Sequence, residues 1–465
     1  MRRLMLPVLA CLALLYVGSA YTAPATDTSK SNASTAMSAP VTAAPAAKQF
    51  DADKATREWL DTMSPTARAR SDAYFEGGYW LILWDLVVNV AVAWLLLGTG
   101  LSRRLRDFNE KLIKVRFLQT AAYVVEYSIF VGLVTLPWTI YEDWFREKQY
   151  DMANQALSGF LGDWLVNSVV TLVGLTIVLT IIYAIIRKLP RTWWIWGSLV
   201  SVAFAVLIVF IGPKYLEPLQ NKFYPLQESP LKEQILSLAR ANGIPATDVY
   251  EFDASKQTTK MSAHVSGIAG TTRISLNDNL INRASPEEVR AVLGHEMGHY
   301  VLNHVFHGLV EGAVLIVLGF AFVKWAFDKV RLKWGASWGI RDIGDIAGLP
   351  LLLTLLTVYF TVLTPVNNTL TRTQEAEADA FGINTAREPD GFAQAAIHLS
   401  EYRKMEPGKW EEIFFFDHPS GYNRIHRVMV WKAEHLNDAD IAAYDAAHPV
   451  IAMPPEPKPD AAPAK

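Results

Sequence analysis

The residues best suited to chemistry form one short run, His295-Glu296-Met297-Gly298-His299. Histidines four positions apart lie on the same face of a helix, so their imidazole rings can bind one ion. Zinc accepts two imidazoles and a carboxylate and leaves a fourth position for water. Glu296 lies one position round the helix, where its carboxylate can reach that water without binding the metal. The run therefore predicts hydrolysis, in which Glu296 takes a proton from water and later returns it to a leaving amine.

A carboxylate further along the chain is the best candidate for the third metal ligand, because Leu302 and Val305 occupy positions where a longer zinc motif needs glycine and histidine. The run TRTQEAEAD, which begins at residue 371, places Glu375 and Asp379 on one helical face. Glu375 can bind the metal while Asp379 accepts a hydrogen bond from a ligand histidine. Glu377 lies about 200° round the helix and is expected to point elsewhere.

The sequence before the histidines has the features of a helix start. Ser285 can cap the first turn, Pro286 suits the first helical position, and Glu288 stands where a capping box needs it. A helix is therefore expected to run from this point through both histidines and to hold them at the required spacing.

The composition favours a membrane protein. Of the 465 residues, 51% are hydrophobic and only 19% are charged, a balance typical of membrane spans joined by soluble segments. The net charge of −3 gives no indication of nucleic acid as a partner. The only cysteine is Cys11, so no disulfide can form within one chain. Six apolar stretches have the length of a membrane span: Tyr79–Gly98, Phe117–Thr139, Phe160–Ile186, Trp193–Ile211, Val305–Trp325 and Ile346–Val366.

The charges of the connecting loops predict the orientation of these spans. The loops after the first, third and fifth spans are rich in lysine and arginine, whereas the loop after the second is mainly acidic. Basic loops stay in the cytoplasm. The two polar blocks, Gly212–His304 and Asn367–Met453, are then expected outside it.

The first 20 residues predict export across a membrane. Arg2, Arg3, an apolar run and Gly18-Ser19-Ala20 are typical of a signal peptide over residues 1–20, with a retained first span as the alternative. The predicted organisation continues with a linker and periplasmic segment at 21–78, four spans within 79–211, a protease block at 212–304, two spans within 305–366, a second protease block at 367–448 and a disordered tail at 449–465.

Several polar groups lie within the predicted spans, where contact with lipid is costly. They either pair with one another between packed helices or line a water-filled chamber, and the sequence favours neither. The residues are Asp85, Asn89, Glu126, Asp163, Asn167, His307 and Glu311.

Taken together, these motifs resemble the CAAX prenyl protease 1 family of membrane zinc endopeptidases. The resemblance rests on HEMGH at 295–299, on TRTQEAEAD at 371–379, on His418-Pro419 followed by Arg424-Ile425, and on the order of the spans between them. It implies one zinc per chain on His295, His299 and Glu375, supported by Asp379 and Arg372. It also implies that His418 and Arg424 contact the substrate or the developing oxyanion. The alternative for the last two is a capping or core-facing polar pair.

The family also has an edge strand that binds extended peptide, and backbone pairing of that kind tolerates many sequences. Residues 261–267 and 273–276 are expected to form paired strands, with Ser262, Ala263, His264 and Val265 as the substrate-binding residues. Ser262 stands where asparagine is common in the family, and His264 where an aromatic residue is common. The well-known relatives also have seven spans and a site that faces the cytosol, whereas the charges here place the site outside.

The sequence therefore predicts a mostly α-helical polytopic membrane bundle that encloses a polar chamber, with a small α+β zinc-protease domain. The predicted activity is cleavage of polypeptide, prenylated or misfolded, in or near the lipid of a bacterial inner membrane, for processing or quality control. Two alternatives remain: a true CAAX prenyl protease, and a transporter or channel with a structural metal. A structural zinc site would be closed by four protein ligands.

Overall fold

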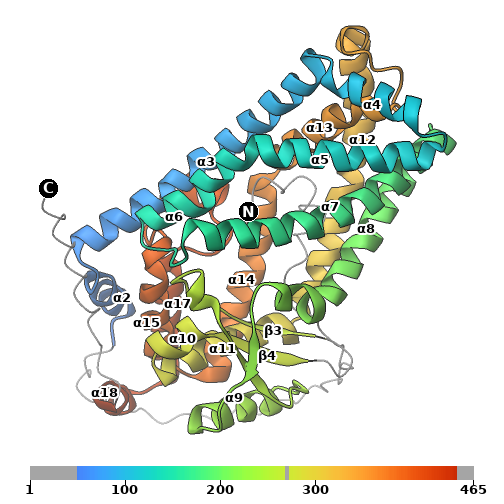
Figure 1. Ribbon diagram of the computed structural model, residues 1–465. Helices are drawn as coiled ribbons and strands as arrows, with labels where there is room; N and C mark the ends of the chain where they lie inside the picture. The colour runs from blue at the N-terminus through green and yellow to red at the C-terminus, as the bar shows by residue number, and fades with distance from the viewer. Residues whose placement is uncertain (1–49, 268–271, 448–465) are drawn as a thin grey trace, which may run out of the picture.

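The computed structural model describes residues 50–267 and 272–447. The predicted signal peptide, the linker up to residue 49 and the tail at 449–465 lie outside these residues. Within them the protein is mostly helical, with one small sheet. Figure 1 shows a bundle of long helices above a body formed by the sheet and shorter helices.

Five helical segments in the described residues are long and apolar enough to cross a membrane. They contain the first five predicted spans, and many of their exposed side chains are large and apolar, including Trp80, Trp84, Trp94 and Leu165. Such an exterior suits contact with lipid acyl chains. The segments are α3 (Pro65–Gly98), α5 to α6 (Arg116–Ile140 and Arg146–Gln149, joined by a π-helical turn), α7 (Leu157–Lys188), α8 (Trp193–Ile211) with the turns that follow it, and α12 (His304–Trp338).

The sixth predicted span is bent. Helix α13 (Leu349–Val362) is followed by α14 (Thr364–Ala386) at an angle of 54°, and the pair has the apolar length of one span. Pro365 lies in the first turn of α14, where a residue without an amide hydrogen begins a helix but cannot continue one. The bend turns α14 away from the direction of α13.

Most of the polar groups in the spans pair with side chains on neighbouring elements, which fits the simpler of the two interpretations. Trp138 donates to Asp85 over 2.8 Å, and Asn109 donates to Glu126 over 2.7 Å. Further pairs are Gln257 with Asp163, Gln220 with Asn167 and Gln374 with Glu311. The polar chamber stays a prediction.

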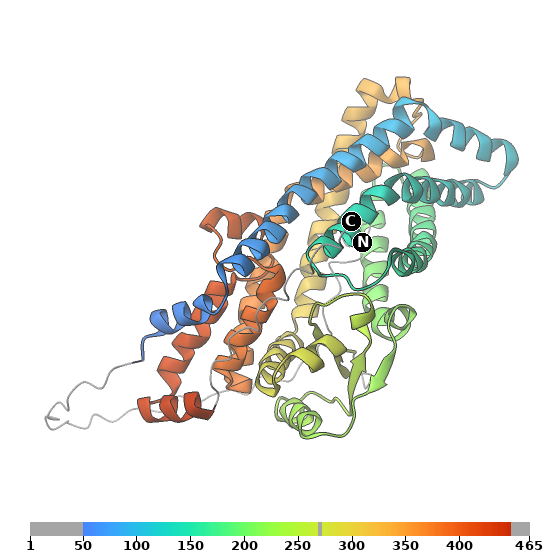
Figure 2. The same ribbon diagram turned by 60° about the vertical axis from the view of Figure 1, so that its left-hand side comes forward.

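The basic loops meet at one end of the bundle. Arg106, on α4 (Leu101–Leu112), contacts Asp345 over 2.5 Å, and Arg187 donates to the carbonyl of Gly344 over 3.1 Å. The acidic loop after the second span instead pairs with residues 257–259, for example through Asn154 N and Gln257 O at 2.9 Å. Figures 1 and 2 show α4 and the sheet at opposite ends of the molecule.

The sheet contains four strands in the order β1 (Phe223–Pro225), β2 (Val249–Phe252), β4 (Arg273–Asn277) and β3 (Ala263–Ser266). Strands β3 and β4 pair antiparallel, as expected, and β3 lies at the edge. Ile274 and Leu276 of β4 are fully buried against Val289 and Leu293 of α11 (Pro286–Val301). The edge strand is thereby fixed beside α11.

A second core joins the helices that follow α14 to the start of the described chain. Leu60, Ala393 and Val428 are fully buried in it. Figure 2 shows this group beside the sheet body. The remaining helices are α2 (Ala52–Asp61), α9 (Pro230–Ala241), α10 (Asp278–Arg283), α15 (Pro389–Leu399), α16 (Lys409–Phe415), α17 (Gly421–His435) and α18 (Asp438–Ala447).

Candidate active site

Helix α11 begins as the sequence predicts. The amide of Glu288 donates to Oγ of Ser285 over 3.2 Å, and the amide of Ser285 donates to the Glu288 carboxylate over 2.8 Å. This reciprocal pair satisfies two amides at the helix start. The helix then continues to Val301 without a break, so His295 and His299 share one face.

Glycines allow α14 to pack directly on the backbone of α11. A Cβ atom at Gly382 would lie 2.7 Å from the amide nitrogen of His295, and one at Gly298 would lie 3.1 Å from Cα of Ala378. Real Cβ atoms do not approach as closely as the first distance, and the second is tighter than most real contacts, so the crossing depends on the absence of side chains at these positions. The close approach brings Glu375 to the two histidines.

The three predicted ligands meet in one buried cluster. Nε2 of His295 lies 3.1 Å from Nε2 of His299 and 3.2 Å from Oε2 of Glu375, and Nε2 of His299 lies 3.5 Å from Oε1 of Glu375. Ligands about 2.1 Å from a tetrahedral ion lie about 3.4 Å from one another. Oε2 of Glu375 is buried and accepts no hydrogen bond within the described residues. The cluster therefore fits a metal ion.

Asp379 supports the ligand His295, as the sequence predicts. Nδ1 of His295 lies 2.8 Å from Oδ1 of Asp379, which is fully buried. Arg424 donates to both oxygens of Asp379, over 2.6 and 3.0 Å. These two donors neutralise and orient Asp379, which is the core-facing polar pair given as the alternative for Arg424. Arg424 also lines the larger cavity, so its contact with the substrate stays a prediction.

Burial and neighbouring charges shift the pKa values of the residues on α11. Burial lowers the pKa of His299 to about 3, which leaves its ring neutral, as a metal ligand must be. Burial also lowers the pKa of His295, but the Asp379 and Glu375 carboxylates outweigh it and raise that pKa to about 10, so metal binding has to displace a proton. Burial raises the pKa of Glu296 to about 7, which suits a general base near neutral pH.

A cavity of about 180 Å³ opens beside the cluster. Glu296 lines it together with Ser262 and Ala263, which lie just before and within the edge strand, so the base and the predicted peptide-binding strand share one space. A smaller hollow of about 20 Å³ adjoins it. The larger cavity has an apolar part formed by Leu280, Val292, Phe392, Ala395 and Leu399.

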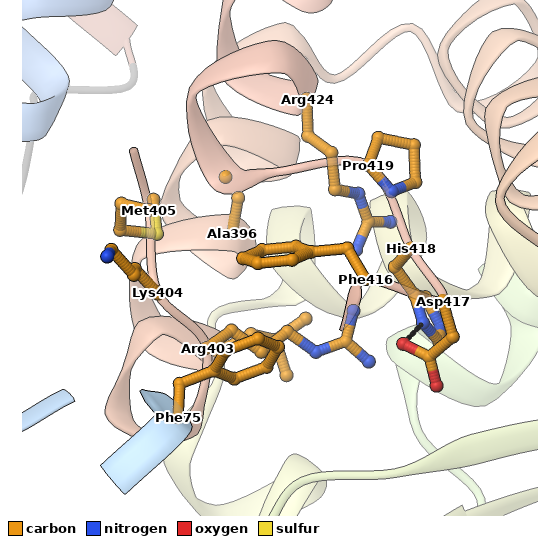
Figure 3. Close-up of a pocket in the computed structure, with 12 residues that line it drawn as sticks. Phe75, Ala396, Arg403, Lys404, Met405, Phe416, Asp417, His418, Pro419 and Arg424 are labelled. Carbon is orange, nitrogen blue, oxygen red and sulfur yellow. Dashed lines mark hydrogen bonds and ion pairs between the residues drawn. The ribbon is translucent and has the colours of Figure 1, made fainter. Parts of the chain in front are cut away.

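His418 lies at the rim of the cluster and lines both spaces. Its Nε2 is 3.2 Å from Oε2 of Glu375, and its Nδ1 is 2.8 Å from Asp417. Figure 3 shows the guanidinium groups of Arg403 and Arg424 pointing toward it. His418 is 24% exposed in its side chain, so it remains within reach of a bound molecule.

Three predicted residues do not line the larger cavity. Arg372 donates to the carbonyls of Glu412 and Phe416 over 2.9 and 2.5 Å, so it anchors the segment that leads to His418 and does not support a ligand. His264 lies 3.7 Å from Glu217, and Val265 is buried in the core of the sheet body. Strand side chains alternate in direction, so His264 projects from the face of β3 opposite to Ala263.

Two residues beside the cluster were not predicted from the sequence. Nδ1 of His304 lies 2.9 Å from Nδ1 of His299, and Nε2 of His304 lies 3.1 Å from Glu377. Glu377 lies away from the three metal ligands, as its position on the helix predicts. It nevertheless contacts His304, which in turn contacts the ligand His299. The available signal was a histidine five positions after His299.

The two halves of the chain match two family models. One, peptidase family M48, matches residues 225–432, and the other, described as CAAX prenyl protease N-terminal with five membrane helices, matches residues 50–222. The uncharacterized metalloprotease YhfN of Bacillus subtilis (strain 168) is 30% identical over 384 residues, which cover 81% of this chain and 89% of that protein. The CAAX prenyl protease 1 homolog of Oryza sativa subsp. japonica is 27% identical over 70% of this chain and 74% of its own length.

The fold has a counterpart among solved structures. The crystal structure of S. mikatae Ste24p matches with a TM-score of 0.67 at 21% identity, over 81% of this chain and 94% of that one. With the metal cluster, the glutamate beside it and the membrane helices, these matches show that the chain belongs to peptidase family M48, together with the CAAX prenyl proteases, and is a membrane metalloprotease.

Proposed function

We propose that the protein is a zinc endopeptidase that holds one zinc ion per chain on His295, His299 and Glu375. The observation that carries this proposal is the placement of Glu296, which lines the same cavity as His295 on the adjoining helical position. A structural site with four protein ligands is not supported, because the metal-binding cluster within the described residues has three.

The chemistry follows from the positions of the side chains. A bound zinc ion supplies a Lewis acid that makes water more acidic and polarises a carbonyl group. Glu296 takes the proton from the attacking water and passes it to the leaving amine. In this proposal His418, whose Nε2 lies 3.2 Å from Glu375 at the rim of the cluster, donates a hydrogen bond to the negative charge that develops on the substrate carbonyl.

The edge strand supplies the binding mode. Strand β3 has a free edge within the described sheet, and Ser262 and Ala263 line the cavity that contains Glu296. An extended peptide that pairs with this edge gains main-chain hydrogen bonds without a strict sequence requirement. This favours extended or unfolded polypeptide as the substrate, and processing or quality control of membrane proteins as the role.

The test compares wild type, Glu296→Gln and Glu375→Ala, with Glu233→Gln on the exposed face of α9 as the matched control. Zinc content and cleavage of an unfolded polypeptide are measured on each purified protein. We expect Glu296→Gln to keep zinc but lose about 10²–10⁴-fold in rate, Glu375→Ala to lose both, and the control to resemble wild type. Full cleavage by Glu296→Gln would exclude Glu296 as the general base, whereas wild type that binds zinc and cleaves nothing would favour a transporter or channel with a structural metal.

A second substrate class is supported by the relatives that are named CAAX prenyl proteases. The same purified protein is offered a prenylated peptide and its unprenylated counterpart. Equal cleavage of the two supports a general endopeptidase. Cleavage of the prenylated peptide alone would replace that role with prenyl-protein processing.

A further inference from the structure

His299 has a hydrogen-bonding partner on the side of its ring that faces away from the metal cluster. Nδ1 of His299 lies 2.9 Å from Nδ1 of His304, and Nε2 of His304 lies 3.1 Å from Oε2 of Glu377. The side chain of His304 is fully buried, whereas that of Glu377 is 55% exposed. Residues from α11, α12 and α14 thus form a chain from a ligand position to the protein surface.

A break between two helices creates this contact. In an unbroken helix residue 304 would lie about 140° round the axis from residue 299. Asn303 instead adopts the left-handed conformation, with φ 58° and ψ 33°, between the end of α11 and the start of α12. Asparagine tolerates this conformation better than most residues. The turn returns the His304 ring to 5.0 Å from the His299 ring, edge to face at 73°.

The contacts define the direction of the hydrogen bonds. A histidine that binds metal through Nε2 carries its proton on Nδ1 and must donate it. Nδ1 of His304 is then the acceptor, which leaves the His304 proton on Nε2, where the carboxylate of Glu377 accepts it. Each donor in the chain therefore meets one acceptor.

We propose that His304 and Glu377 are positioning residues for the metal ligand His299, as Asp379 and Arg424 are for His295. This inference rests on the proposed function, because it assigns a role within the same metal site. The two supports differ in strength. Asp379 is a buried anion in direct contact with its histidine, whereas the anion that supports His299 is one ring further away and exposed to water.

The test measures zinc affinity by competition with a chelator, for wild type and two His304 variants. His304→Phe keeps the shape of the ring and removes the acceptor, and we expect zinc binding about 10–100-fold weaker. His304→Gln retains an acceptor oxygen, so its zinc affinity is expected to lie between that of wild type and that of His304→Phe. Glu377→Gln is expected to weaken binding less than His304→Phe, because the carboxylate is largely hydrated.

His307→Phe is the matched control, since its ring lies one helical turn further on and 6.3 Å from that of His304. We expect it to bind zinc as wild type does. The visible absorption of the Co²⁺-loaded proteins provides a second readout, expected to change for His304→Phe and not for His307→Phe.

The possible results separate this role from the function itself. Equal zinc affinity in wild type and His304→Phe contradicts the positioning role and leaves the protease intact. Equal weakening in His304→Gln and His304→Phe would show that bulk, and not an acceptor, is what matters there. A wild-type protein that binds no zinc contradicts both proposals.

Discussion

At the scale of single residues, the ligand His295 is supported by a buried carboxylate and by the arginine behind it. Asp379 is fully buried and has two partners: His295, which lies on one side of its carboxylate, and Arg424, which lies on the other. A buried carboxylate of this kind is stable only while its cationic partner is present. Arg424 therefore has the structural task that the alternative interpretation of its position describes, that of a core-facing polar pair.

Removal of Arg424 is expected to destabilise the protein. Arg424→Met leaves Asp379 charged and buried without its main partner, and we expect the free energy of unfolding to fall by about 3–5 kcal/mol. Arg427→Met is the control, because Arg427 lies 3.3 Å from Asp379 and its side chain is 34% exposed. Denaturant unfolding in detergent measures both. Equal small effects in the two variants would show that Asp379 does not depend on Arg424.

The apolar part of the cavity is expected to select the substrate side chain beside the bond that is cleaved. A cavity of about 150 Å³ holds a benzene molecule, so a cavity of about 180 Å³ admits a leucine or phenylalanine side chain. Ala395→Leu fills part of it, and we expect kcat/KM for peptides with such side chains to fall about 10–200-fold relative to peptides with alanine.

The control for that variant is Ala380→Leu on the exposed side of α14. A series of peptides that differ at one position, assayed with both variants and wild type, gives the comparison. An unchanged preference in Ala395→Leu would place the substrate side chain elsewhere.

At the scale of elements, the site depends on how two helices cross. Helix α11 carries two ligands and the base, and α14 carries the third ligand and its neighbour Asp379. Their backbones touch at Gly294, Gly298 and Gly382. A change of a few tenths of an ångström there moves Glu375 relative to both histidines.

Gly382→Ala is expected to separate the two helices. The added methyl group would lie 2.7 Å from the amide nitrogen of His295, and overpacking of this kind costs about 1–3 kcal/mol. We therefore expect weaker zinc binding and slower cleavage together. Gly162→Ala in α7 is the control, because no atom lies within 4 Å of its added methyl group. Wild-type zinc affinity in Gly382→Ala would show that the crossing tolerates the shift.

The elements differ in how far the sequence determines them. The capping box of α11, the first five spans and the pairing of β3 with β4 follow from local patterns and appear as expected. The bend before α14 had a local signal in Pro365, but its angle depends on packing. The contact between His299 and His304 requires a left-handed residue at Asn303, and single residues of that conformation are not determined by periodicity.

The candidate site shows the same division. His295, His299, Glu375 and Asp379 come together as their spacing predicts. The partner of Arg424 and the direction of Arg372 depend on segments far away in the chain, so residue type alone could not assign them. The motifs predicted correctly which residues gather at the metal site. They did not predict which partners the more distant residues contact.

At the scale of the whole molecule, the basic loops and the metal site lie at opposite ends of the helix bundle. Arg106, Arg187 and Arg341 meet partners from neighbouring loops at one end. The sheet, the metal cluster and the acidic loop after the second span lie toward the other. The positive-inside rule then predicts a site on the side of the membrane opposite the cytoplasm.

Labelling of single cysteines is expected to show this orientation. In a Cys11→Ser background, Ser337→Cys marks the basic end and Glu434→Cys marks the catalytic end, and both positions are exposed. A membrane-impermeant maleimide applied to spheroplasts is expected to label residue 434 at once and residue 337 only after lysis. The reverse pattern would place the active site in the cytoplasm.

The most direct test of the whole account is a zinc titration of the metal-free protein. Chelated and dialysed wild type is supplied with increasing zinc, and peptide cleavage and bound zinc are measured on the same samples. We predict that cleavage is absent at the start, rises in proportion to bound zinc and reaches its maximum at one ion per chain. Full cleavage by the metal-free protein would contradict the assignment of His295, His299 and Glu375 as the centre of the reaction.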